Sequence, residues 1–336
     1  MKQNDNAFSI YVLENENNRI ELSDLGATLV SWKTKKSDGS WQEIVLGYDD
    51  LDSYRTQDGY LGACLGRVAN RIKKGQFTLN DTVYTLPINN GPNCLHGGID
   101  GFSYKRFDVK QDESSLAFHY VSKDQEEGFP GNLDVWLTYS LKKNTLTIHY
   151  EALSDADTLV NLSNHSYFNL EGSDSIQDHR LLVKASKFME VDADGLVKGV
   201  YRDLPADMDF QQEKPIGQAL SSSIEQIEVA KGIDHPYLFN DSHDPIVLRS
   251  PLSHLVLTMN TSYPLAQIYS ANYLDGRLGK GQRPMPKQSG ICFEAQYLPN
   301  EINIDPQTKT ILRKGEKYDE WTSYTISYEN SESIDQ

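Results

Sequence analysis

Residues 161–170, NLSNHSYFNL, bring together side chains that could do chemistry. His165 and Tyr167 are two positions apart, so an extended chain places them on the same side, with Asn169 following. A core strand would present apolar residues on that face, whereas this one presents an imidazole, a phenol and an amide. Alone, the stretch favours a buried, hydrogen-bonded structural histidine, and the alternative is the wall of a pocket.

A second candidate is Glu294, in the segment 290–297, GICFEAQY. Apolar residues at 291, 293 and 295 alternate there with Cys292, Glu294 and Gln296. A glutamate within a hydrophobic strand is uncommon unless it is exposed, paired or functional. If its face lines a pocket, Glu294 is a rigidly held carboxylate suited to general base catalysis; if the face meets solvent, it is an ordinary surface residue.

Two arginines and an asparagine lie in the segment 66–72, GRVANRI. In an extended chain Arg67 and Arg71 share one side and Asn70 lies on the other. Either arginine alone fits the surface of an edge strand.

Two further polar segments have a histidine or an aspartate beside glycine. In 91–98, GPNCLHGG, the glycines after His96 let backbone or ligand approach the ring closely. Cys94 and His96 have no neighbouring Cys/His cluster, so we expect no metal there. In 232–237, GIDHPY, Asp234 could simply cap a turn.

The composition excludes several classes of partner. Of 336 residues, 38% are hydrophobic, enough for a large core, and 48 acidic against 32 basic residues give a net charge of −16. Such a surface repels phosphate backbones and anionic lipids, so we expect no nucleic acid and no membrane as partner. It is compatible with a neutral substrate.

The chain shows no sign of export or membrane insertion. No apolar run follows Met1, and none approaches the roughly 18 residues that a membrane helix needs. Cys64, Cys94 and Cys292 are odd in number and widely spaced, as expected of reduced thiols. We therefore expect a cytoplasmic protein.

Alternation of apolar and polar residues dominates the chain, for example in 133–139, LDVWLTY, and 322–328, TSYTISY. Asn80-Asp81 predicts a hairpin turn, and helical periodicity is confined to 49–54 and 216–220. Short strands spaced by about 8–12 residues, without intervening helices, predict an all-β antiparallel sandwich. We expect one domain over 1–330 and a frayed tail over 331–336.

Taken together, the polar segments resemble the aldose 1-epimerase (galactose mutarotase) family. The resemblance is carried, in this order, by GRVANRI (66–72), LHGG (95–98), NHSYFNL (164–170), GIDH (232–235) and FEAQ (293–296). It covers nearly the whole chain, and NHSYFNL together with FEAQ is its most specific part. It implies a large antiparallel β-sandwich with only short helical turns, holding a sugar in an open cleft. The implied activity interconverts the α and β anomers of a free aldohexose, with galactose and glucose expected, and needs no cofactor or metal.

The resemblance also implies roles for individual residues. It makes Glu294 the general base and His165 the general acid. The expected substrate-binding residues are Arg71, His96, Asp234, Asn70 and Gln267, and Tyr167 could offer an aromatic face to the sugar. Glu294 would take the proton of the anomeric hydroxyl while His165 protonates the ring oxygen, and the opened chain would reclose as the other anomer. At neutral pH a glutamate with a pKa near 4.3 is ionised, whereas a histidine near 6.5 needs a carboxylate or substrate contact to stay protonated.

Three other functions remain open at this point. A glycosidase would use Asp234 and Glu294 as its two carboxylates. A non-catalytic sugar-binding protein would have lost the acid or the base, and this chain keeps both. A hexose-phosphate mutarotase would carry extra basic residues around the pocket. The chain could be a monomer or a homodimer, and 201–226 could border the cleft.

Overall fold

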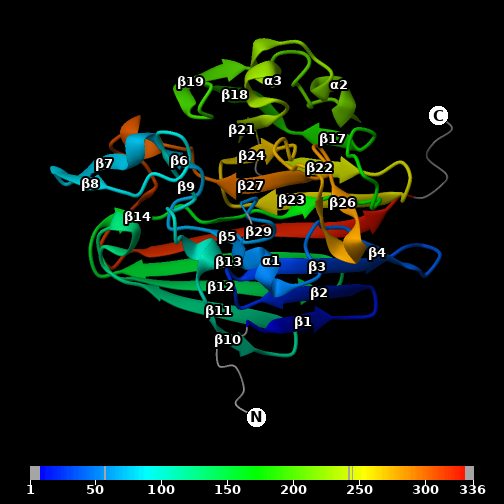
Figure 1. Ribbon diagram of the computed structural model, residues 1–336, viewed down its shortest axis with the longest axis horizontal. Helices are drawn as coiled ribbons and strands as arrows, with labels where there is room; N and C mark the ends of the chain where they lie inside the picture. Colours follow the sequence, from blue (N-terminus) through cyan, green and yellow to red (C-terminus); the bar gives the residue numbers. More distant parts are fainter. Residues whose placement is uncertain (1–7, 57, 241–242, 244, 330–336) are drawn as a thin grey trace.

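The larger sheet is built from strands that have one buried and one more exposed face (Figure 1). The structure is a computed structural model and describes residues 8–56, 58–240, 243 and 245–329. Along β12 (Leu133–Lys142) every second side chain is buried, as the alternation predicts. The nine antiparallel strands follow the order β10 (Asp108–Gln111), β11 (Ser115–Ser122), β12, β13 (Thr145–Ser154), β29 (Lys317–Tyr328), β23 (Leu255–Thr261), β22 (Ile246–Arg249), β17 (Arg180–Val183) and β20 (Lys214–Pro215). The predicted tail over 331–336 lies outside the described residues.

Two smaller sheets form the second layer. One has the order β1 (Ile10–Glu14), β2 (Asn18–Ser23), β3 (Thr28–Lys35), β4 (Trp41–Glu43), and the other β16 (Tyr167–Phe168), β27 (Ile291–Gln296), β24 (Leu265–Tyr269), β21 (Asp234–Phe239), β18 (Ala185–Val191), β19 (Val197–Asp203). A bridge between Val45 and Phe168 joins them. Both layers contribute to one buried cluster, with Phe118 and Leu137 from the large sheet and Trp32 and Phe293 from the smaller ones. The predicted antiparallel sandwich is confirmed.

Short two-stranded ladders connect the strands of the large sheets. Five two-stranded ladders pair β14 (Thr158–Leu159) with β28 (Ile311–Leu312), β15 (Ser163–Asn164) with β5 (Cys64–Leu65), β25 (Arg277–Leu278) with β26 (Pro284–Met285), β6 (Arg71–Ile72) with β9 (Cys94–Leu95), and β7 (Gln76–Leu79) with β8 (Thr82–Thr85). The predicted hairpin is the β7–β8 turn, where Asn80 and Asp81 both adopt positive φ, at 49° and 59°.

Helices are few and short, as predicted. They are α1 (Leu51–Thr56) and α2 (Ile216–Leu220), close to the two expected segments, and α3 (Glu225–Ala230), which the sequence reasoning missed. Single 3₁₀ turns lie at Lys73–Gly75, Phe102–Tyr104, Glu126–Gly128, Lys280–Gln282 and Glu301–Asn303. Within the described ranges, no helix combines the length and apolar character that a membrane crossing requires.

The register of the six-stranded sheet places polar side chains side by side. Across β16, β27, β24 and β21, the directly opposed residues are Tyr167, Cys292, Tyr269 and Asp234. Two positions along β27, Glu294 is opposed to Gln267 on β24. Because residues two apart on a strand share a face, this face carries both Cys292 and Glu294. It forms the floor of the site described next.

Candidate active site

A cavity of about 480 Å³ lies over this sheet face, and its lining also includes residues just before β6 and on both sides of β9. Its lining includes the predicted residues Asn70, Arg71, His96, His165, Tyr167, Asp234 and Glu294. These come from five separate segments of the chain. Gln267 is buried and is not part of the lining. No described residue of 201–226 lines the cavity, so the expectation that this segment borders the cleft is wrong.

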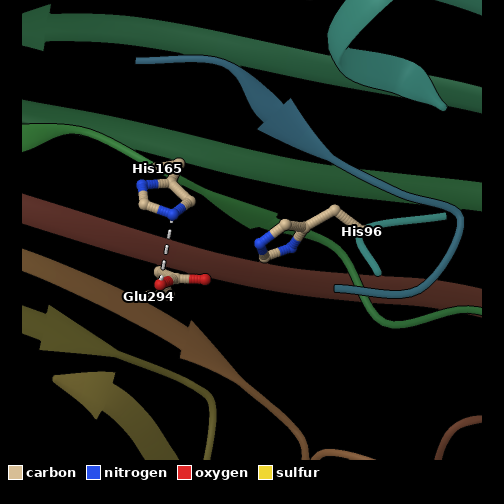
Figure 2. A group of neighbouring side chains, drawn as sticks. All are labelled: His96, His165 and Glu294. Atoms are coloured by element: carbon tan, nitrogen blue, oxygen red, sulfur yellow. Dashed lines mark ion pairs between the residues drawn. The ribbon is translucent and has the colours of Figure 1, made fainter. Parts of the chain in front are cut away.

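His165 and Glu294 face each other within the cavity. His165 Nε2 lies 3.6 Å from Glu294 Oε1, and Figure 2 shows the two side chains converging from different segments, with His96 beside them. The side chains are 6% and 3% exposed, so neither group is solvated as it would be at a surface. Strand β27 holds the carboxylate, and the segment between β15 and β16 holds the imidazole. The pair has the geometry of a buried acid and base with room for a substrate oxygen beside each.

Burial disfavours charge on both members of this pair. It raises the pKa of Glu294 well above the usual range, as does the neighbouring Asp234, while Arg71 opposes the shift. It lowers the pKa of His165 to about 4. The reference values used above for an ionised glutamate therefore do not hold here. A single proton held by the pair leaves no net buried charge, either as carboxylate with imidazolium or as carboxylic acid with neutral imidazole.

His96 is held in one tautomer by the backbone. The N–H of Asn70 donates to His96 Nδ1 at 3.1 Å, so in the neutral ring the proton lies on Nε2. The ring is neutral because burial, His165 and Arg71 lower its pKa well below 6.5. Both residues adopt positive φ, 62° for Asn70 and 51° for His96, an uncommon conformation that is enriched at functional sites. His96 is therefore a hydrogen-bond donor in the cavity.

Arg71 and Asp234 supply the charged hydrogen-bonding groups. Arg71 Nε donates to Asn90 Oδ1 at 3.0 Å, which fixes the guanidinium in the cavity. Gln267 Nε2 donates to Asp234 Oδ1 at 2.6 Å. Gln267 lies on the same sheet face as Glu294, its direct partner across the ladder, and its amide orients the Asp234 carboxylate. Burial raises the pKa of Asp234, while Arg71 and this hydrogen bond lower it.

Aromatic rings surround the imidazole of His165. Tyr167 stacks on it at 4.9 Å between ring centroids, and its hydroxyl donates to the Gly59 carbonyl at 2.8 Å. Tyr60 lies nearly parallel at 6.1 Å and also meets His96 edge-on at 4.7 Å. Sequence reasoning missed Tyr60, Asn90 and Cys292 as neighbours of the site. Tyr60 belongs to none of the recognised motifs, and its positive φ of 53° is visible only in the structure.

Arg67, from the same motif as Arg71, is structural. It is 2% exposed, and its guanidinium donates to carbonyl and hydroxyl oxygens of Ser122, Pro130 and Thr158, among others. The interpretation of two surface arginines on an edge strand is wrong for Arg67. The positive φ of Asn70 turns the chain between the two arginines, so their side chains diverge.

Among the residues that the structure describes, two groups of side chains have ligand atoms close enough for a metal ion. In the first, His96, His165 and Glu294 offer atoms within 4.8 Å of one another. The lone pair of His96 Nδ1 already accepts from Asn70, so a metal on Nε2 would require an imidazolate, and the trio fits a metal poorly. The second group is His149, Glu151 and Asp319 on the outer face of the large sheet, where Lys317 Nζ lies 2.6 Å from Glu151 and 2.9 Å from Asp319.

Comparison with known proteins identifies the family of this fold and site. The profile of the aldose 1-epimerase family matches residues 9–325. The chain belongs to the aldose 1-epimerase family. It is 36% identical to a galactose mutarotase from Bos taurus over 94% of this chain and 93% of that protein, and 36% identical to an aldose 1-epimerase from Haemophilus influenzae over 94% and 95%.

Solved structures agree with this assignment. A GalM/aldose epimerase homologue from C. elegans superposes with a TM-score of 0.90 at 29% identity, covering 96% of this chain and all of that one. Galactose 1-epimerase from Lactobacillus acidophilus gives a TM-score of 0.87 at 28% identity, covering 98% of each chain. The protein is thus an aldose 1-epimerase, an isomerase that acts on a sugar.

Proposed function

We propose that this aldose 1-epimerase interconverts the α and β anomers of neutral aldohexoses, galactose and glucose among them, with Glu294 as general base and His165 as general acid. The observation that carries the proposal is the buried Nε2–Oε1 distance of 3.6 Å within a sugar-sized cavity. Acid and base groups placed on one substrate each contribute about 10²–10⁴-fold.

In the closed-ring complex, the productive state has a Glu294 carboxylate and a His165 imidazolium. Glu294 takes the proton of the anomeric hydroxyl while Nε2 of His165 gives its proton to the ring oxygen, and the bond from the anomeric carbon to that oxygen breaks. Rotation about the first carbon–carbon bond presents the other face of the aldehyde. The reverse transfers close the ring, so the enzyme ends with the proton on His165 again.

Arg71, His96 and Asp234 would bind the sugar hydroxyls. His96 Nε2–H and the Arg71 guanidinium are donors, and the Asp234 carboxylate is an acceptor, so hydroxyls can both accept and donate in one arrangement. Asn70 fixes the tautomer of His96, and Gln267 orients Asp234. Tyr167 stacks on the imidazole of His165 and is part of the cavity lining.

The charge of the cavity favours a neutral sugar over a phosphorylated one. Four acidic side chains line it: Asp58, Asp194, Asp234 and Glu294. Of its two arginines, Arg277 already contacts Asp58 and Asp275. Arg71 alone would have to neutralise the negative charge of a phosphate group. The more numerous carboxylates of the cavity would repel that group.

The first prediction tests the acid and the base. Glu294→Gln and His165→Asn should each abolish catalysed mutarotation, because each replaces a proton-transfer group by an amide that does not titrate. Polarimetry of freshly dissolved α-galactose measures the rate, and circular dichroism checks the fold. Glu113→Gln and His149→Asn, at exposed or half-buried positions away from the cavity, are matched controls. Near wild-type rates in either active-site variant would sink the assignment.

The substrate class is tested with the same assay. Galactose, glucose and xylose should be accepted, and galactose 6-phosphate should react at least about tenfold more slowly, because the phosphate meets the carboxylates of the cavity. Equal rates for galactose and its 6-phosphate would favour a hexose-phosphate mutarotase. Cleavage of a nitrophenyl galactoside would favour a glycosidase using Asp234 and Glu294.

We also propose that residues 1–330 form one domain that works in the cytoplasm as a monomer or homodimer. The family match over 9–325 and the buried cluster shared by both layers support a single domain. Cys64, Cys94 and Cys292 are free and buried, which suits a reducing compartment. Size-exclusion chromatography with light scattering distinguishes the two oligomeric states.

A further inference from the structure

The second ring nitrogen of His165 faces a thiol. Nδ1 lies 3.4 Å from Cys292 Sγ, and both side chains are buried. A hydrogen bond between the ring and the backbone of His165 partly offsets the lowering of its pKa by burial, and Cys292 is the side chain that meets Nδ1. Cys292 lies on the same face of β27 as Glu294, two residues before it. One strand therefore places a side chain beside each ring nitrogen of His165, Cys292 at Nδ1 and Glu294 at Nε2.

We propose that Cys292 is a positioning residue whose Sγ accepts the Nδ1–H of His165 and so reserves Nε2 for the catalytic proton. The inference rests on the proposed role of His165 as general acid. It concerns which ring nitrogen exchanges its proton with the substrate, a choice that the family assignment does not make.

The proton balance of the reaction supports this arrangement. With the ring closed, His165 carries protons on both nitrogens and Glu294 carries none. When the ring opens, Nε2 gives its proton to the ring oxygen and Glu294 receives the proton of the anomeric hydroxyl. His165 is then neutral with its remaining proton on Nδ1. Ring closure reverses both transfers, so Nδ1 keeps its proton throughout and needs an acceptor throughout.

A thiol suits this position because sulfur is a weak acceptor. A carboxylate at Nδ1 would stabilise the imidazolium strongly and raise its pKa, leaving a weaker acid for a poorly basic ring oxygen. Burial, together with Glu294 and Asp234, raises the pKa of Cys292 well above the usual range. The sulfur therefore stays an uncharged thiol, which holds the ring without neutralising it.

The alternative is that the Cys292 thiol donates the hydrogen bond and His165 Nδ1 accepts it. If the thiol donated its hydrogen to Nδ1, the neutral ring would carry its proton on Nε2. Ring closure requires Nε2 to accept a proton from the substrate, and a protonated Nε2 cannot do so. In that tautomer, the hydrogen bond with Cys292 would oppose ring closure.

Nitrogen-15 NMR of the histidine-labelled protein distinguishes the two tautomers directly. The spectrum of His165→Asn identifies the His165 signals by their loss. At neutral pH we expect the neutral ring with a protonated Nδ1 and an unprotonated Nε2. A ring with its proton on Nε2 would overturn the proposal, and the measurement uses the wild-type protein, so it does not depend on a variant that folds.

The pH dependence of kcat/KM provides a second test. Cys292→Ser places a stronger acceptor beside Nδ1 and should move at least one limb of the pH profile to higher pH. Cys292→Ala removes the acceptor and should lower kcat by about tenfold, with KM nearly unchanged. Cys64→Ser, at another buried thiol, is the control for placing a hydroxyl in the interior and should change neither.

The outcomes separate this inference from the proposed function. Wild-type pH profiles and kcat in both Cys292 variants, with His165→Asn inactive, would overturn the role of Cys292 and leave the acid–base pair intact. An active His165→Asn variant would overturn the pair itself.

Discussion

At the scale of single residues, the role of a side chain depends on its burial and on the hydrogen-bond partners around it. Arg67 and Arg71 belong to one motif, yet the first is enclosed by carbonyl and hydroxyl oxygens and the second lines the cavity. Glu294 is enclosed too, but its Oε2 has no hydrogen-bond partner among the described residues. Such a group costs stability and is retained where chemistry requires it.

Glu294→Gln should therefore be more stable than the wild type above neutral pH. The pKa of Glu294 is raised in the folded protein, so the stability linked to its protonation is present at low pH and is lost as pH rises through that pKa. A glutamine does not titrate, so its contribution to the free energy of unfolding does not change with pH. We expect a Tm higher by about 3 °C at pH 8, and a smaller difference at pH 5.

Thermal unfolding followed by circular dichroism measures this difference. Glu113→Gln, which changes an exposed glutamate, should leave the Tm unchanged at both pH values. A Glu294→Gln variant that unfolds below the wild type at pH 8 would contradict the prediction.

At the scale of elements, the six-stranded sheet fixes Glu294, Cys292 and Asp234, and residues outside that sheet bring His165, His96 and Arg71 to it. Cys292 and Glu294 are fixed by the ladders of β27 with β16 and β24. Arg71 instead lies against the turn between β18 and β19. A Cβ added at Gly195 would lie 2.7 Å from the Arg71 Cζ, so this glycine leaves the space that the guanidinium occupies.

Gly195→Ala should therefore weaken sugar binding. The methyl group displaces the flexible end of Arg71. Under the proposed function Arg71 binds the sugar in the ground state and the transition state alike, so KM should rise by about tenfold while kcat changes little. Saturation curves by polarimetry give both constants.

Gly39→Ala is the matched control. Gly39 has a φ of +82°, comparable to +73° at Gly195, and an added Cβ there meets nothing within 4 Å. Both variants bear the similar backbone cost of an alanine at positive φ, about 1 kcal/mol. Only Gly195→Ala should change KM, and an equal change in both would contradict the role of the Arg71 contact.

At the scale of the whole molecule, the sandwich buries four histidines in uncharged form. Burial lowers the pKa of His165 and His179 to about 4 and that of His235 to about 3, and it lowers that of His96 well below 6.5. In the unfolded chain these rings take up protons near pH 6.5. Unfolding therefore takes up protons between about pH 6.5 and 4.

Stability should fall as pH drops through this window, because the unfolded state binds more protons than the folded one. The measurement is Tm as a function of pH from 7 to 5. His165→Asn should show a shallower dependence than the wild type, and His149→Asn, at a half-buried site on the outer sheet face, should follow the wild type. A Tm that stays constant across this range would contradict the prediction.

The sequence by itself determined the fold class and pointed to residues that the structure brings together around one cavity. Period-two alternation predicted the sandwich because one face of each long strand is buried, and Asn80-Asp81 predicted a hairpin because both residues tolerate positive φ. The motifs around His165 and Glu294 identified the family, which similarity to known aldose 1-epimerases confirms.

Only the tertiary structure decided how those residues work together. The contact of His165 with Glu294 and Cys292 joins segments distant in the chain, and no local spacing encodes it. The buried role of Arg67 and the contact of Gln267 with Asp234 likewise depend on segments that meet only in the folded protein. The pKa of each group follows from the water excluded around it, and that exclusion exists only once both layers have packed.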